Sequence, residues 1–337
     1  MSNGMIVTVA YPGWRRKRTL YAVTASGSWE VSTKGIGSLS INAREAHMLG
    51  FETLRGLWVR VDFGRSGLWG GVIKRNPTEV QGGMMELSAD SFHILLKGIV
   101  TQRTYRQASA PAGSLWLSAI SDLATDRAWW IDSFEADEGG PCLQMEWRGD
   151  DLYDLTDYLA TNSGHEWDVV LNEDWTISAV FRKQVGRDKR GSVLLADGYN
   201  VRSGSVQPSN DPLINVIYAS TEDEDWEGAE STVAINAASR DQYGTIAATR
   251  RYAATLGAES LYTRAQADLA TLAKPAIPAT ILIPANNPIV SDIRQGDLVR
   301  YWSVRQNKAY EFRVLSRSID LDDGDVKLSG DCEALTI

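Results

Sequence analysis

Three histidines offer the quickest test for metal or acid–base chemistry in this chain of 337 residues. His47, His93 and His165 lie far apart, and no second histidine, cysteine or carboxylate stands near them at the spacing of a metal-binding motif. A zinc site or a facial triad needs several such ligands to converge. The pattern therefore favours structural or exposed histidines, and we expect no metal site and no bound cofactor.

Nucleophile and phosphate-binding motifs give no stronger signal. A hydrolase elbow of the Gly-x-Ser-x-Gly type does not occur, and Ser203 and Ser205 lie within an alternating, strand-like stretch. The glycines of residues 35–37 lack the third glycine and the following helix of a dinucleotide fingerprint, and no P-loop is present. We therefore expect no catalytic residues, and assign these glycines to turns and β-bulges.

An acidic stretch near the C-terminus resembles a calcium loop. In residues 320–325 (DLDDGD) the glycine comes one place too early, and Asp331 or Glu333 would have to replace the glutamate at the twelfth position. The Asp-Gly pair at residues 323–324 is instead typical of a hairpin turn. We expect a turn between two strands here.

A second acidic run, residues 222–230, carries six carboxylates around Trp226. It could bind a divalent ion or supply paired carboxylates. A consecutive run cannot, however, place an acid and a nucleophile on opposite sides of a sugar ring, as glycosidases require. The pattern favours a solvated loop.

Tryptophan is abundant, and aromatic platforms bind sugars and single strands. The twelve tryptophans are spread over the whole chain, and Trp129 and Trp130 form the only adjacent pair. Scatter favours core and subunit-interface packing, with a sugar-binding surface as the alternative. The full set is Trp14, Trp29, Trp58, Trp69, Trp116, Trp129, Trp130, Trp147, Trp167, Trp175, Trp226 and Trp302.

Composition excludes several classes of protein. The 43 acidic against 34 basic residues give a net charge of -9, which argues against a dedicated nucleic-acid binder. Cys142 and Cys332 form neither a disulfide framework nor a zinc motif, so we expect a reducing compartment. No apolar stretch reaches the length of a membrane helix, and no export signal is visible. The basic residues 15–18 (RRKR) are interpreted as a solvated loop or a local interface patch.

Short alternating strands with glycine-containing turns dominate the first hundred residues, which is typical of an antiparallel barrel or sandwich. A hairpin loop is expected at residues 64–67, and a short helical crossing at residues 89–96. The strands are expected at residues 29–31, 39–41, 57–63, 68–72 and 84–87.

Helices enter between residues 100 and 199, so an α+β unit is expected there. One amphipathic helix starts behind Ser114 and ends near Asp126. A second is capped by Asp151, aligns three leucines on one face, and stops at Gly164. Residues 167–181 then read as a hairpin.

The remaining chain returns to strands, interrupted by one helix. Residues 201–206 and 213–219 are strand-like, and Ala265, Leu269 and Leu272 mark a helix that closes at Pro275. Because this helix lies between two sets of strands, it indicates an insertion within a β unit. The last strands are expected at residues 281–283, 298–302, 310–315 and 326–328.

Taken in order, several stretches resemble the hub proteins at the tail tip or baseplate of long-tailed, siphovirus-like phages. The resemblance covers nearly the whole chain and rests on the order and spacing of the set. The stretches are residues 68–73 (LWGGVI), 85–92 (MELSADSF), 95–96 (LL), 154–160 (DLTDYLA), 215–217 (NVI), 238–244 (ASRDQYG) and 292–299 (DIRQGDLV).

The resemblance implies a β-rich, multidomain α+β fold with two similar antiparallel β-barrels, the second one interrupted by an insertion. The first barrel would span residues 1–99 and a peripheral α+β domain residues 100–199. The second barrel would combine residues 200–238 and 288–337, and residues 239–287 would form a small α/β insertion.

The resemblance also implies a structural role in the virion. The chain would form a homotrimeric, pseudo-sixfold hub ring that lets DNA pass, after synthesis in the cytoplasm of the bacterial host. Its partners would be the tail tube or distal tail protein, the spike or fibres, and the tape-measure protein. Hubs often carry a C-terminal hydrolase or fibre extension, whereas this chain ends at Ile337, so no enzyme is expected. Two alternatives stay open: a carbohydrate-binding or carbohydrate-active β protein of a tail, and a hub of a contractile injection system.

Overall fold

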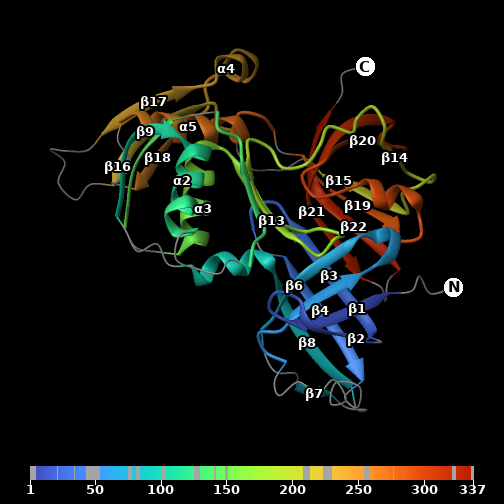
Figure 1. Ribbon diagram of the computed structural model, residues 1–337. Coiled ribbons are helices and arrows are strands. Elements are labelled where there is room, and N and C mark those ends of the chain that lie inside the picture. Colours follow the sequence, from blue (N-terminus) through green and yellow to red (C-terminus); the bar gives the residue numbers. More distant parts are fainter. Residues whose placement is uncertain are drawn as a thin grey trace.

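A computed structural model describes most of the chain (Figure 1). Strands dominate it, in one 14-stranded sheet and three smaller sheets of two or three strands. The predicted β-rich α+β class is confirmed. The described residues are 5–20, 22–33, 35–42, 54–74, 78–80, 84–99, 104–124, 130–139, 142–148, 151–207, 213–222, 230–253, 258–275, 277–320 and 324–334.

The first β unit contains the N-terminal strands, in the order β3-β4-β8-β6-β5-β1-β2 with β7 beside β8. The expected hairpin loop is confirmed as the 3-10 helix η1 (Gly64–Ser66), which joins β5 to β6. The bounds are β1 (Ile6–Tyr11), β2 (Arg15–Leu20), β3 (Ala22–Glu30), β4 (Ile36–Asn42), β5 (Trp58–Asp62), β6 (Leu68–Ile73), β7 (Thr78–Val80) and β8 (Met84–Ser91).

Trp69 in β6 fills the centre of this unit, with 1 % of its surface exposed. Its indole N–H donates to the carbonyl of Ser28 at 3.0 Å. Glycine is required opposite the ring, because a Cβ at Gly37 would lie 2.5 Å from the ring and one at Gly27 would lie 3.0 Å from it. The large side chain and the small residues of β3 and β4 therefore depend on one another.

We expect Gly37→Ala to lower the free energy of unfolding by about 2 kcal/mol, because the buried ring must shift to admit the methyl group. Urea unfolding followed by circular dichroism measures this loss. Gly139→Ala is the matched control, since nothing lies within 4 Å of a Cβ there. Equal stability of the two variants would show that the ring is not tightly confined.

The C-terminal β unit lies beside the first one (Figure 1). In this unit β19 pairs with β15 and β22, and β20 pairs with β14 and β21. The 3-10 helix η3 (Pro288–Asp292) comes between β19 and β20. The strands are β14 (Leu194–Ala196), β15 (Ser203–Val206), β19 (Pro278–Pro284), β20 (Leu298–Ser303), β21 (Lys308–Asp320) and β22 (Asp325–Ala334).

Strand β21 joins the two β units into one sheet. On one side its first half pairs with β20, and its second half, from Ser316 to Asp320, pairs with β3. The change of partner falls where the register of β21 against β22 shifts, between Val314 and Ser316. A bulge of this kind bends a strand and re-aims it. The two units accordingly share one hydrophobic core, which runs from Val7 to Cys332.

The α+β unit packs against the first β unit through a second core. Trp116 in α2 is fully buried and stacks on Phe181 with ring centroids 5.6 Å apart. The bounds are η2 (Phe92–Gly98), β9 (Thr104–Pro111), α2 (Ala112–Ala124), β10 (Ser133–Ala136), β11 (Cys142–Arg148), α3 (Leu152–Ser163), β12 (Glu166–Leu171) and β13 (Ile177–Arg182).

Most predicted features of this unit are confirmed, but α2 begins at Ala112, so Ser114 lies within the helix and the predicted start behind Ser114 is wrong. The Asp151 carboxylate accepts the N–H of Asp154 at 2.9 Å as the cap of α3, and Gly164 ends the helix with φ +69°. The hairpin of β12 and β13 is present. The expected helical crossing at residues 89–96 is wrong in its first half, because β8 continues to Ser91 before the 3-10 turn η2 begins.

The insertion forms a small sheet, β17-β16-β18, with α5 packed on one face. Its elements are β16 (Val216–Glu222), β17 (Ser231–Ile235), α4 (Ala237–Tyr243), β18 (Ala247–Ala253) and α5 (Ala258–Leu272). The helix predicted around Ala265, Leu269 and Leu272 is confirmed as α5, which begins earlier, at Ala258.

Two strand assignments near this insertion need correction. We expected residues 213–219 to pair with the C-terminal strands, but β16 pairs with β17 and β18 instead. Residues 281–283, placed in the insertion, belong to β19 of the large sheet. An apolar, β-branched strand has the same pattern in both settings, because Ile217 is as fully buried under α5 as it would be in a barrel.

Candidate functional site

The basic run at residues 15–18 is an edge strand, so its interpretation as a loop is wrong. Strand β2 pairs with β1 alone among the described strands, and its side chains are exposed from Arg15 to Thr19. The register shifts between Val9 and Tyr11, and Arg16 has a φ of +51°. Charges and bulges on an edge strand discourage further strand addition. The surface is therefore suited to side-chain contacts rather than to backbone pairing.

Tryptophan rings pack against Lys17 of this basic run and against Arg60 of β5. The Lys17 ammonium lies 3.7 Å from the ring centroid of Trp175, and the Arg60 guanidinium lies 4.0 Å from the same ring. Trp14 meets Trp175 edge-on at 4.9 Å and Trp58 at 5.2 Å. Cation–aromatic contacts hold the positive side chains in place without neutralising them. The result is a rigid positive corner on the first β unit.

Charge is divided unevenly between the parts of the chain. Residues 1–99 carry 12 lysines and arginines against 7 aspartates and glutamates, whereas residues 100–337 carry 22 against 36. The first β unit is therefore positive within a negative protein.

Most of the tryptophans that the structure describes serve packing. Trp58, Trp69, Trp116 and Trp167 are each at most 2 % exposed. Trp130 is 42 % exposed and meets Trp58 edge-on at 5.7 Å, while its neighbour Trp129 lies outside the described residues. The expected use of tryptophan in the core is confirmed for these four, and Trp130 is left as a surface contact.

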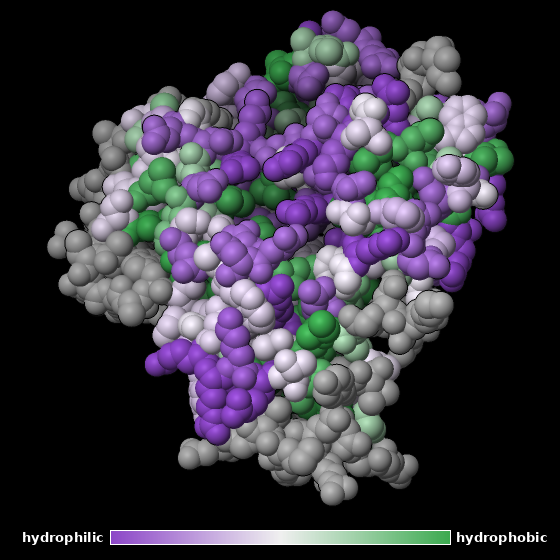
Figure 2. Space-filling view, turned by 45° about the vertical axis from the view of Figure 1, so that its right-hand side comes forward, coloured by the Kyte–Doolittle hydropathy of each residue, from purple (hydrophilic) through white to green (hydrophobic). Residues whose placement is uncertain are grey.

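A second exposed surface lies at the end of the C-terminal β unit. Tyr199 is 88 % exposed, Val304 57 % and Leu194 54 %. The backbone keeps them near each other, because the carboxylate of Asp197 accepts the N–H of Val304 and β14 pairs with β20. Figure 2 shows hydrophobic surface on this side of the molecule, bordered by hydrophilic residues. An apolar area with a polar rim is typical of a protein–protein contact.

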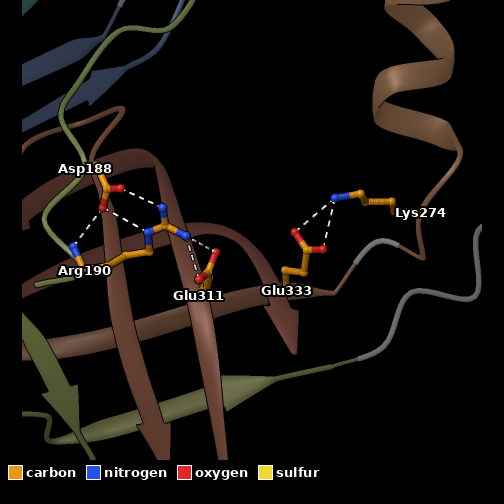
Figure 3. A network of polar contacts seen from close by, with 5 residues as sticks. All are labelled: Asp188, Arg190, Lys274, Glu311 and Glu333. Atoms are coloured by element: carbon orange, nitrogen blue, oxygen red, sulfur yellow. Dashed lines mark hydrogen bonds and ion pairs between the residues drawn. The ribbon is translucent and has the colours of Figure 1, made fainter. Parts of the chain in front are cut away.

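Ion pairs link neighbouring elements to the outer face of the same unit (Figure 3). Glu311 in β21 stands directly opposite Glu333 in β22, an arrangement in which like charges repel. Arg190 contacts both carboxylate oxygens of Glu311 at 2.7 Å, and Lys274, which follows α5, lies 3.0 Å from Glu333. Hydrogen bonds from Arg190 lower the pKa of Asp188 to about 2. Glu311 and Glu333 are thus paired with different cations, and Arg190 is shared between Glu311 and Asp188.

A buried polar network lies where the three parts of the chain meet. The imidazole Nε2 of His93, which follows β8, is 3.0 Å from the Asp168 carboxylate in β12. The other Asp168 oxygen accepts from the side chain of Gln295, in the segment before β20, at 2.8 Å. His93 and Asp168 are 3 % and 2 % exposed. Because His93 also contacts Ser91 of β8 at 2.8 Å, the network ties the first β unit, the α+β unit and the C-terminal unit together.

The same network contains a serine, which raises the question of catalysis. The Ser91 hydroxyl lies 2.8 Å from His93 Nδ1 and accepts the N–H of Gly35 at 3.0 Å. The ring tautomer sets the roles: with the proton on Nε2, His93 donates to Asp168 and accepts from Ser91 at Nδ1, whereas an unprotonated Nε2 accepts the Val169 N–H at 3.3 Å. A contact between the same kinds of atom recurs at 2.9 Å between Ser163 and His165, where the serine hydroxyl donates to the carbonyl of Leu159 and therefore accepts from the ring. This repetition, and the burial of both side chains, with Ser91 7 % and His93 3 % exposed, favour a structural role over that of a nucleophile.

Burial of His165 has a consequence for acid stability. Desolvation lowers its pKa from the ordinary value, and its ring stacks on Phe181. Unfolding therefore takes up a proton once the pH falls below about 6.5, and stability decreases by up to about 1.4 kcal/mol per pH unit from this group. We expect His165→Gln to flatten the fall of the urea midpoint between pH 7 and pH 5. An unchanged slope would contradict this assignment.

Several candidates from the sequence lie outside the described residues. They are His47, Trp129, Trp226 and most of the acidic run at 222–230. So do residues 321–323, although β21 and β22 pair as the expected hairpin up to Asp320 and Asp325. Among the described residues no group of three or more potential ligands could hold a metal ion.

The two cysteines are free, and burial raises the pKa of Cys332 to about 12. Within the described part of the chain, no helix is long and apolar enough to span a membrane.

The arrangement defines a class of fold: a large two-part antiparallel sheet with an α+β unit and an inserted small sheet. No protein-family model matches the chain, and no curated protein sequence matches it. Solved structures do match. A tail protein from Neisseria meningitidis MC58 superposes with a TM-score of 0.66 at 13 % identity, covering 98 % of this chain and 97 % of its own.

Two further structures share the fold. The 43 kDa tail protein of prophage MuSo2 from Shewanella oneidensis has a TM-score of 0.64 at 12 % identity, over 97 % of this chain and 98 % of its own. The E. coli c3393 protein, a type VI secretion component similar in structure to T4 bacteriophage tail proteins gp27 and gp5, has a TM-score of 0.52 at 11 % identity. It matches over 94 % of this chain and 74 % of its own. The expected resemblance to phage tail proteins is confirmed, as a likeness of fold.

Proposed function

We propose that this chain is a structural hub protein of a phage tail tip or baseplate and that it works as a homotrimer. The observation that carries the proposal is the likeness of fold to a tail protein over 98 % of this chain. The two β units, one within residues 1–99 and the other built from β14, β15 and β19 to β22, would be the two barrel domains. Three copies would then present six such units in a pseudo-sixfold ring.

The surface charges support a ring that closes head to tail. The positive corner at β2 belongs to the first β unit, and the excess of carboxylates belongs to residues 100–337. A heterologous contact pairs these unlike surfaces in every protomer, and rotation closes the ring. The apolar surface around Tyr199 would lie within such contacts, where burial of more than about 1,000 Å² makes an interface stable.

In the virion the ring would join the tail tube or distal tail protein to the spike or fibres, with the tape-measure protein and DNA passing its centre. A wall without excess positive charge suits DNA passage, because it does not neutralise phosphates. The chain would act through its contacts rather than through a reaction, since the Ser91, His93 and Asp168 side chains are held as a strut.

Electron microscopy of the purified chain tests this proposal. Class averages are expected to show rings with threefold symmetry and six peripheral lobes, and a co-expressed tail-tube protein is expected to stack on one face. Single particles of monomer size, with no ring in the presence of the tube protein, would contradict the proposal.

A contractile injection system is the second candidate, because the type VI component shares the fold. Neighbouring reading frames distinguish the two: a sheath gene beside this one supports the contractile system, and its absence beside a long helical tape-measure gene supports the flexible tail. A carbohydrate-binding role is tested by Trp130→Ala, since Trp130 is the exposed tryptophan of the expected pair. Loss of glycan binding in a folded variant would support that role.

A further inference from the structure

A cleft of about 640 Å³ opens at the junction of the three parts of the chain. The first β unit contributes Trp29 and Arg65 to its wall, β12 contributes Asp168, and the segment between β19 and β20 contributes Arg294. Its volume is in the range of clefts that hold small ligands or short peptide segments. The cleft is separate from the exposed surface at Tyr199 and borders the positive corner at β2 through Arg60.

A buried cation lies in the wall of this cleft. Arg317 of β21 is 5 % exposed, and its guanidinium lies 5.0 Å from the ring centroid of Trp29. Its Nη2 donates to the carbonyls of Ser66 and, at 3.4 Å, Val290. Its Nε finds no acceptor among the described residues. Burial, with the nearby charge of Arg294, lowers the pKa of Arg317 to about 10, so the group is charged at neutral pH.

No carboxylate of the described residues forms an ion pair with this cation. Asp297 is the acid whose charge acts on Arg317, but Lys189 holds its carboxylate at 2.8 Å. The backbone N–H groups of Arg187 and Arg294 occupy the same carboxylate at 2.8 Å each. A buried charge without a partner is costly, and a ligand of opposite charge would remove that cost.

Counting the charges in the wall identifies the kind of ligand. Among the described residues, four arginines and three acidic residues line the cleft, which leaves one positive charge in excess. The arginines are Arg60, Arg65, Arg294 and Arg317, and the acidic residues are Asp62, Asp168 and Glu173.

We propose that this cleft binds a single carboxylate presented by an acidic peptide segment of a partner protein. One negative charge balances the excess, whereas a phosphate or nucleic-acid backbone would bring further charge toward the three acids. Ser28, Asn172 and Gln295 add neutral polar groups to the wall, which suit the amides of a peptide. A bound carboxylate would hold the first and C-terminal β units together at their contact. The proposal goes beyond the hub role and applies equally to a monomer.

Isothermal titration calorimetry of the full chain at low ionic strength tests this site with three probes: Ac-Gly-Glu-Gly-NH2, Ac-Gly-Gln-Gly-NH2 and inorganic phosphate. We expect the glutamate peptide to bind and the glutamine peptide not to bind. Arg294→Gln, at the exposed rim, is expected to weaken binding about tenfold through the loss of a charged donor. Arg305→Gln is the matched control, because Arg305 is exposed outside the cleft and its loss should leave binding unchanged.

Arg317→Met is the second variant, and circular dichroism first establishes that it folds. We expect the folded variant to lose glutamate-peptide binding. Three results would overturn the proposal: equal binding of the two peptides or none at all, equal effects of the Arg294 and Arg305 variants, or tighter binding of phosphate than of the glutamate peptide. If Arg317→Met does not fold, the Arg294 and Arg305 pair decides the outcome alone.

Discussion

Replacing Asp168 with alanine is expected to lower the free energy of unfolding by about 3 kcal/mol, because removal of one partner leaves buried polar groups unpaired. His93 loses its acceptor at 3.0 Å and Gln295 loses its acceptor at 2.8 Å. Gln295 comes from the C-terminal unit, and His93 in turn contacts Ser91 of β8, so the damage falls on the junction. Urea unfolding measures the loss, and limited proteolysis reports whether the parts separate first.

Two variants control this experiment. Asp168→Asn keeps an oxygen for the imidazole N–H and is expected to cost about 1 kcal/mol. Asp241→Ala removes a carboxylate that is 76 % exposed on α4 and is expected to leave stability unchanged. If Asp168→Ala proves no more harmful than Asp241→Ala, the network does not hold the three parts together.

Reversing charge on the edge strand is expected to abolish assembly. In the double variant Arg16→Glu and Arg18→Glu, β2 carries negative charge where it would face the acidic surface of the next protomer. Like charges placed together at an interface cost several kcal/mol, so we expect the association to weaken by at least about 100-fold. Light scattering coupled to gel filtration measures the change in mass.

Strand β18 offers a matched control for this variant. Arg250 and Arg251 are also exposed cations on an edge strand, and reversing both changes the net charge by the same amount. We expect the β18 variant to assemble normally, because the insertion lies outside the proposed ring contact. Equal loss of assembly in both variants would show a general effect of net charge, and normal assembly of the β2 variant would exclude β2 from the interface.

Local features of the fold could be predicted from the sequence because their causes are local. Asp151 and Gly164 define both ends of α3 through a cap and a left-handed stop. The alternation of β5 and β6 around η1 likewise follows from residues within a few positions of each other. Signals of this kind depend on backbone chemistry that neighbouring residues determine.

The features that position the site were not predictable in the same way. Strand β21 changes its partner from β20 to β3, and no residue near the bulge indicates which distant strand will follow. His93 and Asp168 are 75 positions apart, so an analysis of ligand spacing finds no partner for the histidine. Four consecutive basic residues resemble a loop, although a bulged edge strand accommodates them equally well. A Ser-x-His pattern occurs at both His93 and His165. It is the sequence signal that could have indicated two buried histidines that contact a nearby serine.

The solution mass of the purified chain tests the central claim most directly. A homotrimer of a 37.1 kDa chain has a mass of about 111 kDa, and light scattering is expected to give this value over a wide range of concentration, with salt weakening it because charge guides the contact. A mass of 37.1 kDa at the highest concentration, unchanged by addition of the tail-tube protein, would contradict the hub assignment.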